Sequence, residues 1–252
     1  MNINPKVSIV MPTLNCAEFI KLSLLSVSNQ SYKNIETIIV DGNSLDDTRQ
    51  IIKKIIPKAK IFNTKAKGIW HAINYGAQKA SGTLIFHLNA DDLIAQNSIS
   101  QLVNEYLNTK CRALWLPVYK AGHFGQTFAR KRAFLGIGEV FPGHSASFLI
   151  EKKLLRQFNY YDPSTVFCAD NHLFYKILAN KIPVRVIKLS RSSFGLFTQG
   201  GFSSTNPYLR KIFEEVKFRS QFKLPFSDFF FIFIIFPLKC LNSIMKTLIS
   251  NI

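Results

Sequence analysis

The chain of 252 residues lacks several features that define common protein classes. Its four cysteines are scattered, with no Cys-x-x-Cys pair and no histidine at zinc-finger spacing, so neither a disulfide framework nor a cysteine zinc site is predicted. The first apolar run, 7–11, has five residues and is shorter than the roughly 7–15 of a signal-peptide core. We therefore expect a reducing, cytoplasmic setting.

A glycine-rich dinucleotide motif is also absent. The segment that follows the first apolar run, 12–16, reads Pro-Thr-Leu-Asn-Cys and contains no glycine. Dinucleotide oxidoreductases need Gly-x-Gly-x-x-Gly at this point, because backbone must approach the pyrophosphate closely. This class is excluded.

Acidic residues are scarce, 15 against 32 Lys and Arg, which gives a net charge of +17. The excess is uneven, because residues 110–252 carry +14 and residues 1–109 only +3. An anionic partner is therefore expected to face the second half of the chain. Nucleic acid, an anionic membrane surface and a phosphorylated substrate would all fit this charge.

The chain does contain a repeated alternation of short apolar runs and helical patterns. The runs rich in Ile and Val are 7–11, 35–40, 59–62, 83–88 and 111–119. Helical patterns begin near Ala17, Ser44, Gly68 and Ala95. Strands that are apolar on both faces and separated by helices predict an α/β fold with a mostly parallel central sheet covered by helices on both faces.

The segments after the first four predicted strands are all polar. They are 12–15, 41–48, 65–68 and 89–92. In parallel α/β sheets, ligands bind beyond the carboxyl ends of the strands. We therefore expect these four segments to converge on one binding edge.

The second of these segments has a local interpretation and a functional one. Ser44 as a helix cap with Asp47 three residues on fits a capping box, and Asp46 favours the dipole of the same helix. Asp41 is not explained in this way, because it stands at the strand end before Gly42. A carboxylate only accepts hydrogen bonds, so Asp41 is suited to bind the N–H donors of a nucleobase.

The fourth segment, Asn89-Ala-Asp91-Asp92, allows two interpretations. Extended geometry would place Asn89 and Asp91 on the same side. A divalent cation that also binds a diphosphate needs few protein oxygens, because phosphates and water fill its other positions. The local pattern alone supports equally well a cap, from Asp91 or Asp92, for a helix that starts near Ala95.

Three segments in this order, VSIVMPTLN, IIVDGNSLDDT and KGIWHAINYGAQKASGTLIFHLNADD, together resemble glycosyltransferase family 2. The likeness is to the bacterial enzymes that build capsule, exopolysaccharide and O-antigen repeat units. It is strong over residues 6–92 and weaker from there to about 205. It implies a GT-A fold and an inverting transfer of sugar from a nucleotide-sugar, a UDP-sugar by default, to a lipid-diphosphate-linked saccharide acceptor.

The resemblance also implies roles for single residues. Those that match nucleotide-sugar-binding positions of the family are Thr13, Asn15, Asp41, Lys67, Gly68 and Asn89. Asn89 and Asp91 occupy the first and last positions of the family's D-x-D motif. Asn89 would lie near the ribose, and Asp91 would bind Mg²⁺ or Mn²⁺.

The resemblance places the catalytic base at Asp170. The segment 168–173, Cys-Ala-Asp-Asn-His-Leu, matches the family's A-D-x-D-L, with His172 in place of the second acid. The local pattern alone equally favours Asp170 as the N-cap of the helix that follows. His144, in Pro-Gly-His-Ser, matches an acceptor-side segment, and His71 stands where the family usually has Asp.

The resemblance divides the chain into a GT-A domain over 1–205 and a tail over 206–252. Within the domain, 1–92 is the nucleotide-binding half and 93–205 the acceptor-binding and catalytic half. The tail is basic and Phe-rich, and its ten-residue apolar run is too short to span a bilayer. We expect it to attach peripherally to the anionic inner face of the membrane, with packing on the domain or in an oligomer as the alternative.

Two other function classes stay open. Asn89, His71 and His172 depart from the commonest family residues, which leaves room for a catalytically degenerate sugar-binding or scaffold protein. The basic, aromatic second half allows nucleic-acid binding. Its cations are dispersed, however, and 130–132 is the only run of three, so we expect no nucleic-acid partner.

Overall fold

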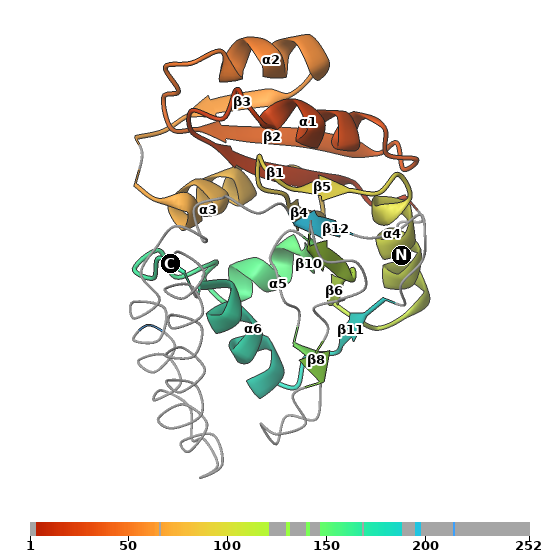
Figure 1. The fold of residues 1–252 in the computed structure, drawn as a ribbon. Coiled ribbons are helices and arrows are strands. Elements are labelled where there is room, and N and C mark those ends of the chain that lie inside the picture. The colour runs from red at the N-terminus through yellow and green to blue at the C-terminus, as the bar shows by residue number, and fades with distance from the viewer. Residues whose placement is uncertain are drawn as a thin grey trace, which may run out of the picture.

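The computed structural model describes residues 4–65, 67–120, 130–131, 140–141, 147–167, 169–187, 195–197 and Glu214. Seven strands form a central sheet in the spatial order β11-β6-β10-β4-β1-β2-β3 (Figure 1). They are β1 (Val7–Thr13), β2 (Ile35–Asp41), β3 (Lys60–Asn63), β4 (Leu84–His87), β6 (Ala113–Trp115), β10 (Phe148–Glu151) and β11 (Val184–Val186). Of these seven, β10 alone runs antiparallel to its neighbours.

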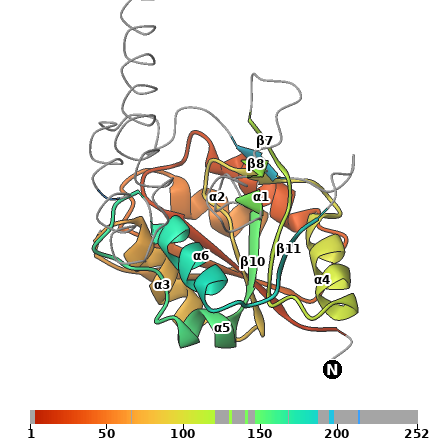
Figure 2. The same cartoon turned by 90° about the horizontal axis from the view of Figure 1, so that it is seen from below.

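Helices cover both faces of this sheet. One layer holds α1 (Ile20–Ser28), α2 (Thr48–Ile55) and α4 (Ser98–Asn108). The other holds α3 (Ile69–Lys79), α5 (Lys152–Gln157) and α6 (Ala169–Ala179). Figure 2 shows α3, α5 and α6 grouped together, apart from α4. The predicted α/β class with a mostly parallel central sheet is confirmed.

The two layers follow from the alternation of side chains along buried strands. Successive residues of a strand point to opposite faces. Ile9 therefore packs into the core with α1, and Val10 packs into the core with α3. Helix α3 lies close to the sheet because Gly76 has no side chain; a Cβ there would stand 2.5 Å from Cγ1 of Val10 and 2.9 Å from Cγ2 of Val40.

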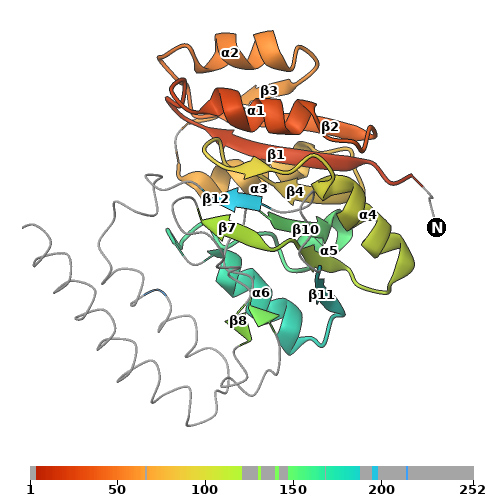
Figure 3. The same cartoon turned by 45° about the vertical axis from the view of Figure 1, so that its right-hand side comes forward.

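The predicted strand 111–119 is two strands, which is a correction. Pro117 lacks an N–H and interrupts the ladder between them. After β6, the chain leaves the central sheet for a second, three-stranded sheet in the order β5-β12-β7 (Figure 3). The strands of this sheet are β5 (Leu93–Ile94), β7 (Val118–Lys120) and β12 (Gly195–Phe197), and a separate pair is formed by β8 (Arg130–Lys131) and β9 (Val140–Phe141).

The structure describes only some of the residues that concern the cysteines, the tail and the acceptor-side histidine. Cys16 and Cys111 are free thiols. No helix within the described residues is both long and apolar enough to cross a membrane. The tail 206–252 lies outside the described residues except for Glu214, and His144 also lies outside them.

Candidate functional site

The carboxyl ends of four parallel strands meet at one edge of the central sheet, as predicted. Thr13 ends β1 and is the register partner of Asp41, which ends β2. The segment after β3 joins them, because the N–H of Thr64 donates to the carbonyl oxygen of Asp41 at 2.9 Å. Strand β4 pairs in parallel with β1 and ends at His87. This edge therefore brings together the polar segments that the sequence singled out.

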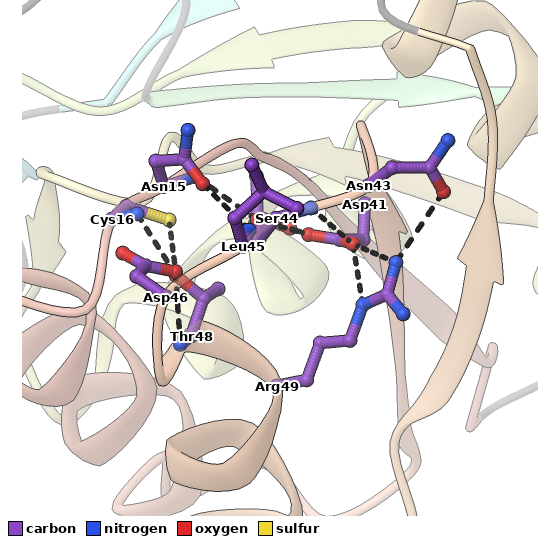
Figure 4. A network of polar contacts seen from close by, with 10 residues as sticks. Asn15, Cys16, Asp41, Asn43, Ser44, Leu45, Asp46, Thr48 and Arg49 are labelled. Atoms are coloured by element: carbon purple, nitrogen blue, oxygen red, sulfur yellow. Dashed lines mark hydrogen bonds and ion pairs between the residues drawn. The ribbon is translucent and has the colours of Figure 1, made fainter.

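Asp41 is completely enclosed at this edge, with no exposed surface. Its Oδ1 accepts hydrogen bonds from the hydroxyls of Thr13, at 3.1 Å, and Ser44, at 2.5 Å. Its Oδ2 accepts from the N–H of Ser44, at 3.0 Å, and from Nε and Nη2 of Arg49, both at 2.6 Å (Figure 4). Arg49 comes from α2 and was not singled out by the sequence.

These donors decide the charge of Asp41. Burial by itself raises the pKa of the Asp41 carboxyl, but hydrogen bonds from Ser44 and Arg49 outweigh burial and hold the pKa below its ordinary value. The edge therefore presents a buried carboxylate that is ionised at neutral pH.

Ser44 does not cap a helix, which corrects the capping-box interpretation. Helix α2 begins at Thr48, with Asp47 as its N-cap residue and no side-chain capping bond. Both donors of Ser44 are engaged by Asp41, and its hydroxyl also accepts from the N–H of Asn15 at 2.9 Å. Asp46 accepts from the N–H of Ala17 at 2.9 Å and, as expected of an acid at the start of this helix, from the N–H of Thr48 at 3.1 Å. The segment 42–47 is thus a loop that encloses Asp41.

Asn15 fastens this loop to the end of β1. Its backbone has a φ of 49°, a left-handed conformation that Asn adopts more readily than most residues. Its Oδ1 accepts a hydrogen bond from the N–H of Leu45 at 2.8 Å. Asn15 therefore shapes the wall around Asp41.

Lys67 and Gly68 lie exposed just before α3. Gly68 has a φ of 100°, and a Cβ there would meet nothing within 4 Å, so its backbone conformation explains the glycine better than packing does. His71 follows in the first turn of α3. Its Nδ1 is buried and has no hydrogen-bond partner among the described residues.

The segment 89–92 is a turn, not a continuation of β4. The N–H of Asp92 donates to the carbonyl oxygen of Asn89 at 3.2 Å, and the Asn89 amide donates to Oδ2 of Asp92 at 2.9 Å. The expectation that Asn89 and Asp91 share one side of an extended strand is therefore wrong. The helix-cap alternative is also wrong, since α4 begins at Ser98 with Asn97 as its N-cap residue.

Asp91 is the acid of this turn that is suited to a cation. Asp92 is fully buried, whereas Asp91 is partly exposed, and burial raises the pKa of its carboxyl. Within the described residues, no group of three or more His, Cys, Asp or Glu side chains could hold a metal ion. The residues fit an ion such as Mg²⁺ that takes one or two protein carboxylates and completes its shell with substrate phosphates and water.

Asp170 lies in the first turn of α6, one residue inside the helix, so it is not the N-cap residue. Its negative charge acts on Tyr161, and burial together with this charge raises the pKa of the Tyr161 hydroxyl. That hydroxyl lies 2.8 Å from Nδ1 of His87, the last residue of β4, and both side chains are buried. The Tyr161–His87 pair therefore links the surroundings of Asp170 to the strand that leads into 89–92.

The segment that leads into α6 is held from two sides. Nε1 of Trp70, on α3, donates to the carbonyl oxygen of Val166 at 3.0 Å, and the Trp70 ring stacks on Tyr161 with centroids 5.1 Å apart. The carboxylate of Glu214 accepts from the N–H groups of Val166, at 2.9 Å, and Phe167, at 2.8 Å. No spacing rule in the sequence points to Trp70, Tyr161 or Glu214, because their partners are about 50 to 100 residues away.

His172 lies close to Asp162. It is 6% exposed, and its Nδ1 lies 3.6 Å from Oδ2 of Asp162. Burial lowers the pKa of the imidazole. The replacement of the family's second acid by His172 is thus accommodated inside the fold.

Comparison with known sequences gives one family. The model of glycosyl transferase family 2 matches residues 8–182. An uncharacterised glycosyltransferase of Haemophilus influenzae is 38% identical over 104 residues, which are 40% of this chain and 42% of that protein. The chondroitin synthase of Pasteurella multocida is 31% identical over 112 residues, 43% of this chain and 12% of the synthase. The chain thus spans less than half the length of either relative.

Solved structures show the same fold. S. aureus TarS 1–349 in complex with UDP superposes with a TM-score of 0.65 at 20% identity, covering 77% of this chain and 60% of that 1–349 chain. The mannosyltransferase PcManGT from Pyrobaculum calidifontis, in complex with GDP-Man and Mn²⁺, gives 0.69 at 18% identity, covering 93% and 72%.

Proposed function

Because the chain belongs to glycosyl transferase family 2, we propose that it transfers a sugar from a nucleotide-sugar, expected to be a UDP-sugar, to a hydroxyl of a lipid-diphosphate-linked saccharide. The observation that carries this proposal is the strand-end edge, where the buried, ionised Asp41 at the end of β2 and the segment 89–92 after β4 lie on either side of β1. The complexes of TarS with UDP and of PcManGT with GDP-Man support a nucleotide-sugar donor. The matches to chondroitin synthases support a polysaccharide product.

In this proposal, the nucleotide lies across the ends of β1, β2 and β4. Asp41 accepts the N–H of the base, and Thr13 and Asn15 form the wall around it. Lys67 and Gly68 line the next part of the pocket, and Asn89 lies on the ribose side. The exposed Lys67 adds a positive charge where the donor carries its diphosphate.

Asp91 would hold Mg²⁺ or Mn²⁺, with the diphosphate and water as the other ligands. When bound, the cation offsets the negative charge that grows on the departing nucleoside diphosphate. The partly exposed position of Asp91 leaves room for a ligand to approach, whereas the neighbouring Asp92 is fully enclosed.

Asp170 would act as the general base. It accepts the proton of the acceptor hydroxyl as that oxygen attacks the anomeric carbon, and the bond from this carbon to the diphosphate oxygen breaks in the same step. A single displacement of this kind inverts the anomeric configuration. Trp70 and Glu214 hold the backbone three and four residues before Asp170, which keeps the base oriented.

The protein would work at a membrane surface, because a lipid-linked acceptor resides there. The +14 charge of residues 110–252 suits an anionic leaflet, where each Lys or Arg close to the surface contributes about 1 kcal/mol. We propose that the tail 206–252 attaches the 1–205 domain peripherally to the inner face of the membrane.

The function is tested by a screen of nucleotide-sugars, with release of nucleoside diphosphate as the readout and Mn²⁺ or Mg²⁺ present or removed by a chelator. We expect release with one or a few donors, loss on chelation, and loss in Asp91→Asn. Asp47→Asn, at an exposed position outside this turn, is the control for the loss of one negative charge and should leave release unchanged. Binding of donors without any hydrolysis or transfer would instead favour a degenerate sugar-binding protein.

A further inference from the structure

Donors from the protein itself fill all the hydrogen-bond acceptor sites of the Asp41 carboxylate, the group proposed to bind the base. An ionised carboxylate offers about four acceptor sites on its two oxygens. Five N–H and O–H groups, from Thr13, Ser44 and Arg49, already lie 2.5 to 3.1 Å from the Asp41 oxygens. Figure 4 shows those of Ser44 and Arg49. A base that presents an N–H to Asp41 therefore has to displace one of these donors.

Two of the three donor residues are fixed in place. Thr13 is a buried residue of β1 whose carbonyl oxygen accepts from the N–H of Gly42 at 2.8 Å. Ser44 uses its N–H and its hydroxyl on Asp41 at once, and Asn15 binds the same hydroxyl. Displacing either residue would break hydrogen bonds inside the fold.

Arg49 is the donor that can leave. Its side chain is 35% exposed, comes from the surface helix α2, and reaches Asp41 through a flexible chain of methylenes. Its further contact, from Nη2 to Oδ1 of Asn43, is long at 3.4 Å. A guanidinium that leaves this position enters water, where its hydrogen-bonding groups are satisfied again, so its loss from Asp41 costs less than that of Thr13 or Ser44.

We propose that Arg49 is a specificity-determining residue that occupies the base-reading position of Asp41 in the free protein and yields it to the N–H of an entering base. This inference rests on the proposed function. A base with an imide N–H, such as uracil, donates a hydrogen bond to Asp41 in place of the one that Arg49 gives up. A base without such a donor cannot replace the hydrogen bond from Arg49 to Asp41. Arg49 therefore stays in place, and that base binds more weakly.

The test is the affinity of UDP, measured by titration calorimetry at pH 8, for the protein and for Arg49→Gln. UDP binding must break the contact between Arg49 and Asp41, which weakens the observed affinity. Removing the Arg49 guanidinium should therefore lower the dissociation constant of UDP about three- to tenfold. Lys53→Gln is the matched control, since Lys53 is an exposed cation of the same helix and its loss changes the net charge equally. Arg49→Lys keeps the charge and should fall between the two.

The second arm uses UDP methylated at N3 of the uracil, which lacks the imide N–H. We expect no gain in affinity for this probe in Arg49→Gln, because it cannot use the freed carboxylate. UDP affinity in Arg49→Gln that is no better than in Lys53→Gln would overturn the inference, as would an equal gain for the methylated probe. Failure of the unaltered protein to bind any nucleoside diphosphate would contradict the proposed function itself.

Discussion

Single buried polar residues define the candidate site, and each depends on the side chains that bond to it. Asp41 stays ionised because Ser44 and Arg49 donate to it. His87, which is fully enclosed, is kept neutral by burial, which lowers its pKa to about 3, and its Nδ1 pairs with the hydroxyl of Tyr161. A substitution that removes one partner should therefore affect the other.

Tyr161→Phe tests this dependence. It removes the hydroxyl that faces His87 and leaves the imidazole Nδ1 buried without a partner. We expect the free energy of unfolding to fall by about 1–3 kcal/mol, the usual cost of leaving a buried polar atom unsatisfied. Urea denaturation followed by circular dichroism measures this change.

Tyr32→Phe is the matched control for Tyr161→Phe. The Tyr32 hydroxyl donates to Asn4 and Pro5 near the surface, so water can replace it as a partner. We expect a smaller loss of stability than for Tyr161→Phe. An equal loss in both variants would show that burial of the His87 pair has no special importance.

At this scale the sequence predicts residues that follow strands but not the partners that hold them. Asp41 is found because it ends an apolar strand before a glycine. Arg49 is missed because its link to Asp41 depends on the path of the loop 42–47, which no local pattern encodes. The expectation that Asn89 and Asp91 lie on one side of an extended strand is wrong for a similar reason. The Asn89 side chain donates a hydrogen bond to Asp92 and closes a turn.

At the scale of elements, a second polar cluster ties the amino ends of four strands together, opposite the candidate site. Glu36, near the start of β2, accepts hydrogen bonds from Ser8 on β1, from Lys60 on β3 and from Ser81 and Gly82 before β4. Burial alone would raise the pKa of Glu36, but these bonds lower it from 4.5 to about 2. The cluster therefore stabilises the strand order around β1.

This pKa gives a pH dependence with a definite sign. Because the folded-state pKa lies below the unfolded value, the stabilisation is complete above about pH 4.5 and is lost as the pH falls to about 2. Glu36→Gln should lower the free energy of unfolding by about 3 kcal/mol at pH 7. The gap between variant and parent should narrow steadily below pH 4.5.

Urea denaturation from pH 7 down to pH 3 measures this gap. Glu18→Gln, at an exposed position just before α1, is the control for the loss of one carboxylate and should change the free energy of unfolding at pH 7 far less than Glu36→Gln. A Glu36→Gln effect that stays constant over this range would contradict the assigned role of the carboxylate charge.

The elements themselves are largely predictable from the sequence, whereas their ends are less so. Buried strands rich in Ile and Val stand out because both faces are covered. Helix starts shift because their polar residues have other partners: Ser44 binds Asp41, and α2 begins four residues later. The run 111–119 is divided because Pro117 cannot continue a ladder.

At the scale of the whole molecule, two sheets and two helical layers bring distant segments to one edge. The sequence predicts the class and the family, and the GT-A fold is confirmed by the likeness to TarS and PcManGT. It does not predict that β10 inserts between β4 and β6, because such pairings join residues more than 30 positions apart. The sequence also does not predict the hydrogen bonds from Val166 and Phe167 to Glu214, because these residues are nearly 50 positions apart.

The charge asymmetry predicts how the whole molecule meets a membrane. Deleting residues 226–252 removes the apolar run and is expected to move the protein from the membrane fraction to the supernatant on cell fractionation. A wash of the full chain in high salt should release only part of it, because salt screens the charges but not the apolar contacts. A truncated protein that stays with the membrane would contradict the attachment.

The central claim is that this edge binds a nucleotide-sugar and that Asp170 activates the acceptor. It is tested most directly in Asp170→Asn, by measuring donor affinity and the rate of sugar transfer on the same preparation. We predict an unchanged dissociation constant for the donor and a fall in kcat of about 100-fold or more, because the amide cannot take the proton. Transfer at the rate of the unaltered protein would contradict the account.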